Sequence, residues 1–164
     1  MSTAFTAAYL EALALNPSFS IDDKIQTLLQ LGIDTFGLTQ ATISRHLGRE
    51  LVMEYVAPSS VPLKPGTVMT LSRTYCDITL KLRYTLAIDN MLESAHRAHP
   101  CYRELGVETY FGTPLIVNGE LYGTLNFTAP RSRGALFTPE DKAQLELLGT
   151  VVASLLAQRQ ILAA

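Results

Sequence analysis

Four side chains that can bind a metal or carry redox chemistry lie in the middle of the chain: Cys76, His96, His99 and Cys101. Imidazole nitrogen and thiolate sulfur at close spacing suit zinc or haem iron. A structural zinc site needs four ligands, so Cys76 would have to join the other three from a separate segment. In the simpler interpretation the histidines bond the backbone of a loop while the cysteines fill small apolar gaps. We therefore predict no metal site.

Other arrangements of catalytic residues have no support in the sequence. No spacing favours a Ser–His–Asp set or paired carboxylates, and there is no glycine-rich phosphate loop. Asp89 follows a predicted strand at 86–88 and is expected to accept backbone N–H bonds rather than transfer protons. We predict that the chain is not an enzyme. The alternative is redox chemistry at Cys76 or Cys101.

Length and charge restrict the class of protein further. The 164 residues suit one domain with its own core, and a net charge of -2 gives no electrostatic footprint for nucleic acid. No run of about twenty apolar residues predicts a membrane span, and the N-terminus lacks a secretory pattern. Two cysteines are too few for a disulfide framework. We expect a cytoplasmic protein with reduced thiols.

The central positioning element is a hairpin between Val107 and Pro130. Asn118-Gly119 predicts a two-residue type I′ turn between two alternating runs. Counting outward from the turn places Thr113 opposite Thr124 and Phe111 opposite Asn126. This face mixes hydroxyl, amide and aromatic groups, which suits a ligand pocket. The opposite face is apolar and is expected to lie under helices; it carries Tyr110, Gly112, Pro114, Ile116, Leu121, Gly123, Leu125 and Phe127.

The remaining elements follow from apolar periodicity and from capping residues. Ser20 is the predicted N-cap of the second helix, and Ser72 that of the third. Their order implies an α+β fold with a central antiparallel sheet of five or six strands. Terminal helices would cover one face, and a loop-and-helix cover would enclose a pocket on the other. The expected elements are helices at 3–15, 21–36, 73–82 and 139–162, strands at 41–47, 51–56, 68–71 and 86–88, a proline-rich loop at 57–66, and an irregular segment at 91–106 that Pro100 interrupts.

The C-terminal helix has a strong start and a regular apolar stripe. Thr138 is the predicted N-cap and Pro139 the first helical residue. Beyond Val152 the stripe either packs on its own sheet or faces a second subunit. On the second interpretation, Arg159 would reach solvent or an acid on the partner, and Leu155→Glu would give a folded monomer. The stripe consists of Leu145, Leu148, Val152, Leu155 and Leu162.

Four stretches of this sequence together resemble the GAF domain, a small-molecule-sensing module of signalling proteins. They are LSRTYCDITLK, LAIDN, HPCYRELGVETYFGTPLIVNGELYGTLNF and FTPEDKAQLELLG, within about Ser20 to Gln160. The chain looks most like GAF domains attached to bacterial histidine kinases and diguanylate cyclases. The resemblance implies a GAF/PAS-like fold, one domain over residues 1–164 with its core at about 20–160, and transmission of ligand state through the C-terminal helix.

The known ligands of such domains can be compared residue by residue. Bilin-binding members attach the pigment through a Cys-His pair, which Arg97-Ala98 replaces here. The cyclic-nucleotide motif Asn-Lys-Phe-Asp-Glu is matched only weakly by Asn126-Phe127-Thr128. Free-methionine-sulfoxide reductases are GAF-fold enzymes with pocket cysteines, which keeps the redox alternative open. A dimerisation module with a filled pocket is a further alternative. The resemblance therefore leaves the cofactor unknown.

We expect the pocket to bind an unidentified small molecule and the C-terminal helix to form a homodimer, with no nucleic acid and no membrane as partner. The predicted ligand-binding residues lie on the mixed face of the sheet or on the segments covering it. They are Tyr75, Cys76, His99, Tyr102, Phe111, Thr113, Thr124 and Asn126.

Overall fold

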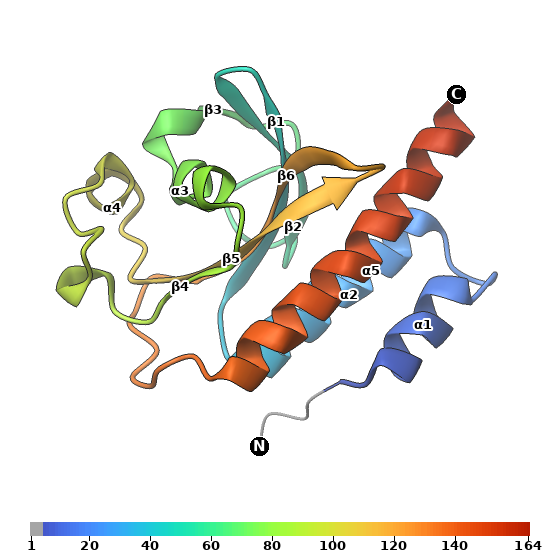
Figure 1. Cartoon of the computed structure of the whole chain (residues 1–164), viewed down its shortest axis with the longest axis horizontal. Coiled ribbons are helices and arrows are strands. Elements are labelled where there is room, and N and C mark those ends of the chain that lie inside the picture. Colours follow the sequence, from blue (N-terminus) through green and yellow to red (C-terminus); the bar gives the residue numbers. More distant parts are fainter. Residues whose placement is uncertain (1–4) are drawn as a thin grey trace.

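The computed structural model describes residues 5–164 and is built on one six-stranded antiparallel sheet (Figure 1). The strand order is β3-β2-β1-β6-β5-β4, so the hairpin of β5 and β6 lies beside that of β1 and β2. This confirms the predicted α+β class and the antiparallel sheet. The strands are β1 (Gln40–Leu47), β2 (Glu50–Ala57), β3 (Val68–Thr70), β4 (Leu86–Ile88), β5 (Thr109–Val117) and β6 (Glu120–Ala129).

Helices cover the two faces of the sheet unequally. On one side α2 (Ile21–Phe36) and α5 (Pro139–Ala163) run side by side, and α1 (Ala7–Leu15) packs against α5 (Figure 1). The other side carries the short helices α3 (Tyr75–Leu82) and α4 (Pro100–Leu105), with single turns at η1 (Leu71–Arg73) and η2 (Met91–Glu93). Thr6 caps α1, and residues 3 and 4 of the predicted first helix lie outside the described residues.

The longer helices begin where local chemistry predicts. The Ser20 hydroxyl accepts a bond from the Asp23 amide at the start of α2. At α5, Thr138 and Asp141 form a reciprocal capping box. The prediction for α3 was wrong at its start: Ser72 lies inside a separate 3-10 turn, and the N-cap position belongs to Thr74. Pro100 begins α4 rather than interrupting it, because proline at the first helical position has no amide to leave unpaired.

The predicted register of the central hairpin was wrong. Asn118 and Gly119 have the positive φ values of the predicted turn, and Ile116 pairs with Leu121. An extra residue in β6, Tyr122, then shifts the register, so that Leu115 pairs with Gly123. Such a bulge changes which partners meet farther along both strands. Thr113 therefore lies opposite Leu125, Phe111 opposite Phe127 and Asn126 opposite Gly112.

The main core lies between the sheet and the helices of both termini. The ring of Phe36 on α2 packs edge-on against Phe111 at 5.0 Å and Phe127 at 5.2 Å. Gly32 allows this approach, because a Cβ there would overlap the ring of Phe127. The four α5 residues that open the predicted apolar stripe are completely buried in this core: Leu145, Leu148, Val152 and Leu155.

Beyond Val152 the stripe continues on its own sheet as far as Leu155. Leu155 is 0% exposed, whereas Leu162 is 76% exposed. The acid that Arg159 bonds is Glu54 of its own domain, and 30% of the arginine side chain remains exposed. The interpretation in which Val152 and Leu155 face a second subunit was therefore wrong. It underestimated how far two long strands with a right-handed twist extend beneath a helix.

Among residues 5–164, α5 alone is long and apolar enough to cross a membrane by length and composition. In this structure its apolar residues pack on the sheet, and its buried positions are Leu145, Leu148, Gly149, Val152, Leu155 and Leu156. The core helix of a soluble domain has the same composition, so the hydropathy of α5 is explained by burial in the core.

Candidate functional site

A small, partly open cavity lies on the second face of the sheet, under α3 and α4. Its volume is about 80 Å³. Apolar side chains from β2 and β3 form one side, and hydroxyl and amide groups from β1 and β6 form another. The lining residues are Gln40, Thr42, Leu51, Met53, Leu63, Met69, Thr74, Tyr75, Cys76, Cys101, Leu105, Val107, Tyr110, Asn126 and Thr128.

Cys76 lies at the centre of a buried polar cluster beside this cavity. Its sulfur accepts bonds from Thr124 Oγ1 at 3.2 Å, Asn126 Nδ2 at 3.3 Å and Tyr110 Oη at 3.8 Å. Thr42 Oγ1 in turn donates to Asn126 Oδ1 at 2.8 Å. The cluster joins α3 to β1, β5 and β6, and its donors are held in place by one another.

Both cysteines are buried, free thiols in the folded chain. Burial raises the pKa of Cys76, although the bonds from Thr124 and Tyr110 act in the opposite direction. Burial also raises the pKa of Cys101 to about 12. A reactive thiol needs exposure and a lowered pKa, because the thiolate is the nucleophile. In this state neither sulfur is a nucleophile at neutral pH.

The raised thiol pKa values predict a loss of stability at alkaline pH. The unfolded chain ionises its cysteines above about pH 8.5, whereas burial keeps Cys76 and Cys101 protonated in the fold. The folded state then binds more protons, so the free energy of unfolding falls as the pH rises. Between pH 8.5 and 9.5 the two thiols together should cost about 2 kcal/mol. Urea denaturation at each pH measures this slope.

The matched control is the variant carrying Cys76→Ala and Cys101→Ala. Its free energy of unfolding should change much less over the same pH interval. Its slope between pH 6 and 7.5 should equal that of the wild type, since no thiol titrates there. An equal slope at alkaline pH would show that the thiols ionise in the fold.

Tyr75 supplies an unpaired polar group at the cavity. The residue is 2% exposed, and its hydroxyl has no hydrogen-bond partner among residues 5–164. The ring packs against Tyr110 at 5.5 Å and His99 at 5.2 Å between ring centroids. Burial raises the pKa of Tyr75, so the hydroxyl stays neutral. A buried hydroxyl without a partner costs about 1–3 kcal/mol, which a bound polar group would offset.

The structure brings together four of the eight predicted ligand residues: Tyr75, Cys76, Thr124 and Asn126. His99 and Tyr102 lie on the outer side of α4. His99 Nδ1 accepts a bond from the amide of Cys101 at 3.1 Å, and the Tyr102 hydroxyl donates to Glu108. Burial lowers the pKa of His99. These two residues belong to the cover of the cavity and not to its lining.

Phe111 and Thr113 lie on the opposite face of the sheet, and their placement in the pocket was wrong. The Phe111 ring stacks on Phe137 at 4.0 Å. The Thr113 methyl lies beneath Gly149 of α5, and its hydroxyl accepts a bond from Thr85 at 3.0 Å. The bulge at Tyr122 is the physical reason, because it shifts the pairing of β5 with β6 by one residue.

Tyr110, Thr42 and Ser44 are pocket-side residues that the sequence analysis missed. Tyr110 takes the place expected for Phe111, and its hydroxyl lies 2.9 Å from Thr79 Oγ1. Ser44 Oγ lies 2.9 Å from Thr124 Oγ1. Alternation in β1 places Thr42 and Ser44 on one face, and pairing β1 with β6 would have identified both.

The region described by the structure holds no cluster of three or more His, Cys, Asp or Glu side chains placed to bind a metal ion. Its histidines have other surroundings. His99 caps α4 through Nδ1, and His96 lies in the loop before it.

The antiparallel sheet has both terminal helices on one face and a cavity on the other, which is the architecture of GAF-type α+β domains. The chain belongs to the GAF family: the GAF domain model matches residues 20–159. No curated protein sequence matches the chain.

Solved structures with the same fold come from proteins of several kinds. Free methionine-R-sulfoxide reductase from Neisseria meningitidis matches with a TM-score of 0.71 and 15% identity over 94% of this chain and 89% of that one. The GAF domain of a two-component sensor histidine kinase from Bacillus halodurans matches with a TM-score of 0.62 and 14% identity, over 84% of this chain and 97% of that one. A phycocyanobilin-bound GAF domain of a cyanobacterial phytochrome matches with a TM-score of 0.72 and 12% identity, over 97% of this chain and 98% of that one. At these identities the likeness establishes the fold alone.

Proposed function

We propose that this GAF domain is a cytoplasmic, regulatory sensor that binds a small molecule at the cavity beside Tyr75 and Cys76 and passes its state to α5. The observation that carries the proposal is the unpaired hydroxyl of Tyr75. It lines the cavity next to a polar cluster centred on Cys76. Buried polar groups are normally paired, so an unpaired group at a cavity points to a missing ligand or water.

We propose that the small size of the cavity reflects a ligand-free state in which the cover lies close to the sheet. Small-molecule pockets usually have volumes of about 300–1,000 Å³, against about 80 Å³ here. A ligand larger than a few waters must displace part of the cover. The candidates are α4 and the segment 58–67, whose Val61 and Leu63 pack on the cavity residues. Binding would then shift the population towards an open cover.

The cavity lining indicates the chemistry of the ligand. Leu51, Met53 and Met69 offer an apolar surface, and the Tyr75 hydroxyl can both donate and accept a hydrogen bond. No charged side chain lines the cavity among the described residues. We therefore propose a neutral, mainly apolar molecule with one polar group that reaches Tyr75.

The redox alternative finds less support. The reductase from Neisseria meningitidis shares the fold, but at 15% identity its activity does not transfer. Burial and raised pKa values leave Cys76 and Cys101 as neutral thiols. Turnover of free methionine sulfoxide by the wild type, lost in Cys76→Ser or Cys101→Ser, would overturn the binding-module proposal.

We also propose that two copies associate through the end of α5, where Ile161 and Leu162 are exposed at 71% and 76%. This interface is smaller than the one expected from the whole apolar stripe, because Leu155 is already buried. Sedimentation of the wild type and of Leu162→Glu at micromolar concentration measures this association.

Tyr75→Phe should have opposite effects on stability and on binding. Removal of the unpaired hydroxyl is expected to raise the free energy of unfolding of the ligand-free protein by about 1 kcal/mol. The same change should weaken a ligand that bonds the hydroxyl about tenfold. Thermal-shift screening of neutral, mainly apolar small molecules that carry one polar group, against both proteins and with native mass spectrometry of the purified wild type, supplies the ligand and the comparison.

Tyr84→Phe is the matched control, because Tyr84 is exposed and lies away from the cavity. It should change neither stability nor binding. Equal affinity of wild type and Tyr75→Phe for every ligand found would place the binding site elsewhere.

A further inference from the structure

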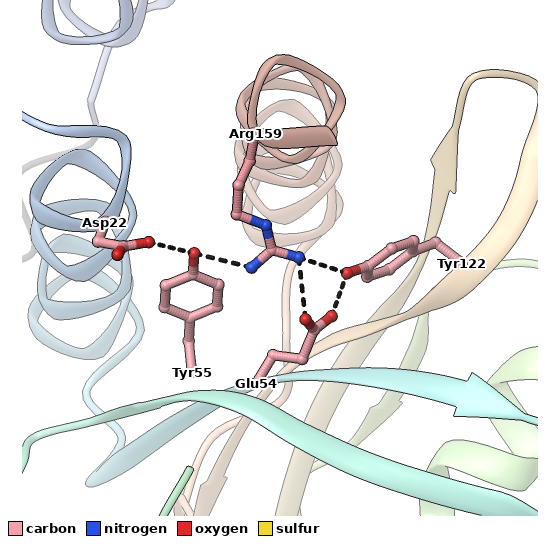
Figure 2. A network of polar contacts seen from close by, with 5 residues as sticks. All are labelled: Asp22, Glu54, Tyr55, Tyr122 and Arg159. Carbon is pink, nitrogen blue, oxygen red and sulfur yellow. Dashed lines mark hydrogen bonds and ion pairs between the residues drawn. The ribbon is translucent and has the colours of Figure 1, made fainter. Parts of the chain in front are cut away.

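A buried-to-surface polar network joins α5 to the face of the sheet opposite the cavity (Figure 2). Its centre is Arg159, in the last part of α5. One terminal nitrogen of the guanidinium, Nη2, donates to Glu54 Oε2 at 2.9 Å and to Tyr122 Oη at 2.7 Å. The other, Nη1, donates to Tyr55 Oη at 2.9 Å. Four elements contribute, because Tyr55 also reaches Asp22 on α2 (Figure 2).

The two tyrosines connect positive and negative groups. The Tyr122 hydroxyl accepts from Arg159 and donates to Glu54. The Tyr55 hydroxyl likewise accepts from Arg159 and donates to Asp22. Each hydroxyl is used as both donor and acceptor, so a shift of either tyrosine breaks bonds on two sides. Such a network is sensitive to small displacements of the strands that carry it.

Two of the three strand residues that Arg159 bonds lie at β-bulges. Along β1 and β2 the pairing jumps from Ile43 with Tyr55 to Ser44 with Met53, which leaves Glu54 as the extra residue. Tyr122 is the extra residue of β6. A bulge re-aims its side chain and kinks its strand. Here two independent bulges supply side chains to one arginine on a helix.

One bulge lies next to a residue of the cavity, and the other lies close to the polar cluster beside it. Met53 lines the cavity and immediately precedes Glu54. Thr124 bonds Cys76 and lies two residues beyond Tyr122. A molecule that displaces Met53 or Thr124 therefore moves backbone that also carries a contact of Arg159.

The last turns of α5 are held on the sheet mainly by the bonds of Arg159. Its last buried residue is Leu156, so the final turns from Ala157 to Ala163 bury no side chain completely. Arg159 bonds both bulged residues, and in those turns the structure shows one further side-chain bond, from Asn118 Nδ2 to Gln160 at 3.1 Å. Loss of the Arg159 bonds would release these turns while the apolar core under α5 stays packed.

We propose that Arg159, Glu54, Tyr55 and Tyr122 form a latch that couples the cavity to the last turns of α5. With the cavity closed, the bulges are in place and the latch holds the helix end on the sheet. When the cavity opens, the bulges shift and the helix end is released. The inference rests on the proposed sensory function and names the contacts that transmit the signal. Arg159 is a positioning residue and does not touch the ligand.

Coupling is reciprocal, so the latch can be tested without a ligand: breaking it must make the cavity open more easily. The readout is the rate at which Ellman's reagent modifies Cys76 at pH 8, in a Cys101→Ala background. The buried thiol reacts only from open molecules. Arg159→Met and Glu54→Gln should each raise the rate about tenfold. Their combination should add little, because both break the same contact.

Two controls separate the latch from general destabilisation. Gln158→Ala changes an exposed residue of the same helical turn, outside the latch, and should leave the rate unchanged. Val152→Ala weakens the core under α5 and should not raise the rate beyond its effect on global unfolding, measured in urea. If Arg159→Met does not fold, Arg159→Lys keeps the charge, loses the two-nitrogen contact and should give a smaller increase.

The outcomes distinguish this inference from the sensory function. Equal rates for Arg159→Met and Gln158→Ala would overturn the latch, and so would an increase that Val152→Ala matches at equal stability. In both cases any ligand found would still support a sensor. An increase confined to the Arg159 and Glu54 variants, with no ligand in the Tyr75 screen, would support the latch and count against the proposed function.

Discussion

Leu155→Glu should strongly destabilise the fold rather than separate two subunits. Leu155 is completely buried between α5 and the sheet, so the substitution places a carboxylate in an apolar site without a partner. The expected cost is about 4 kcal/mol or more, since both the apolar contact and the hydration of the charge are lost. A domain of this size has a total stability of about 5–15 kcal/mol. Circular dichroism with urea denaturation measures the loss.

Gln158→Glu is the control, because it introduces the same carboxylate on the same helix at an exposed position. It should stay within about 0.5 kcal/mol of the wild type. A folded monomer from Leu155→Glu would show instead that the stripe leaves its own sheet and pairs with a second chain, as the heptad spacing alone suggests.

Gly123→Ala should cost about 3 kcal/mol because the new methyl meets backbone. A Cβ at Gly123, directly after the bulge of β6, would overlap the carbonyl oxygen of Ser44 and lie 2.9 Å from Arg45 Cα. Side chains can rotate away from an added methyl, but a paired neighbouring strand cannot move without loss of its ladder bonds. The urea midpoint and the yield of soluble protein should both fall.

Gly112→Ala is the comparison, since it makes the same change in the same sheet. There the Cβ would meet the ring and hydroxyl of Tyr110, which is a side chain. We expect a cost of about 1 kcal/mol. Equal midpoints for the two variants would mean that β1 and β6 have more freedom at Ser44 than their pairing indicates.

Features set by short-range chemistry could be predicted from the sequence alone. Thr138, Pro139 and Asp141 start α5 through bonds within three residues of one another. Asn118-Gly119 forms the hairpin turn because both residues accept positive φ. The order of such elements, with the four matching stretches, was enough for the α+β class and the GAF family.

Half of the predicted site depended on the register of β5 with β6, which local sequence patterns do not contain. Alternation predicts that Tyr110 and Phe111 face opposite ways, and it identifies which is inside only if the register is known. The bulge at Tyr122 sets that register. The Tyr122 side chain donates a hydrogen bond to Glu54, which lies 68 residues earlier in the sequence. Cys76, Thr124 and Asn126 were found because their own strand or helix places them on the pocket side.

The amino-acid sequence by itself determined the elements, their order and the family, because caps, turns and periodicity act over a few residues. The tertiary structure alone decided which face of β5 lines the cavity, how small that cavity is, and what α5 packs against. Arg159 shows the reason most clearly. In the heptad pattern it only interrupts the apolar stripe, but its partners lie 37, 104 and 105 residues away. Only folding brings these groups together, and their contact gives the arginine its role.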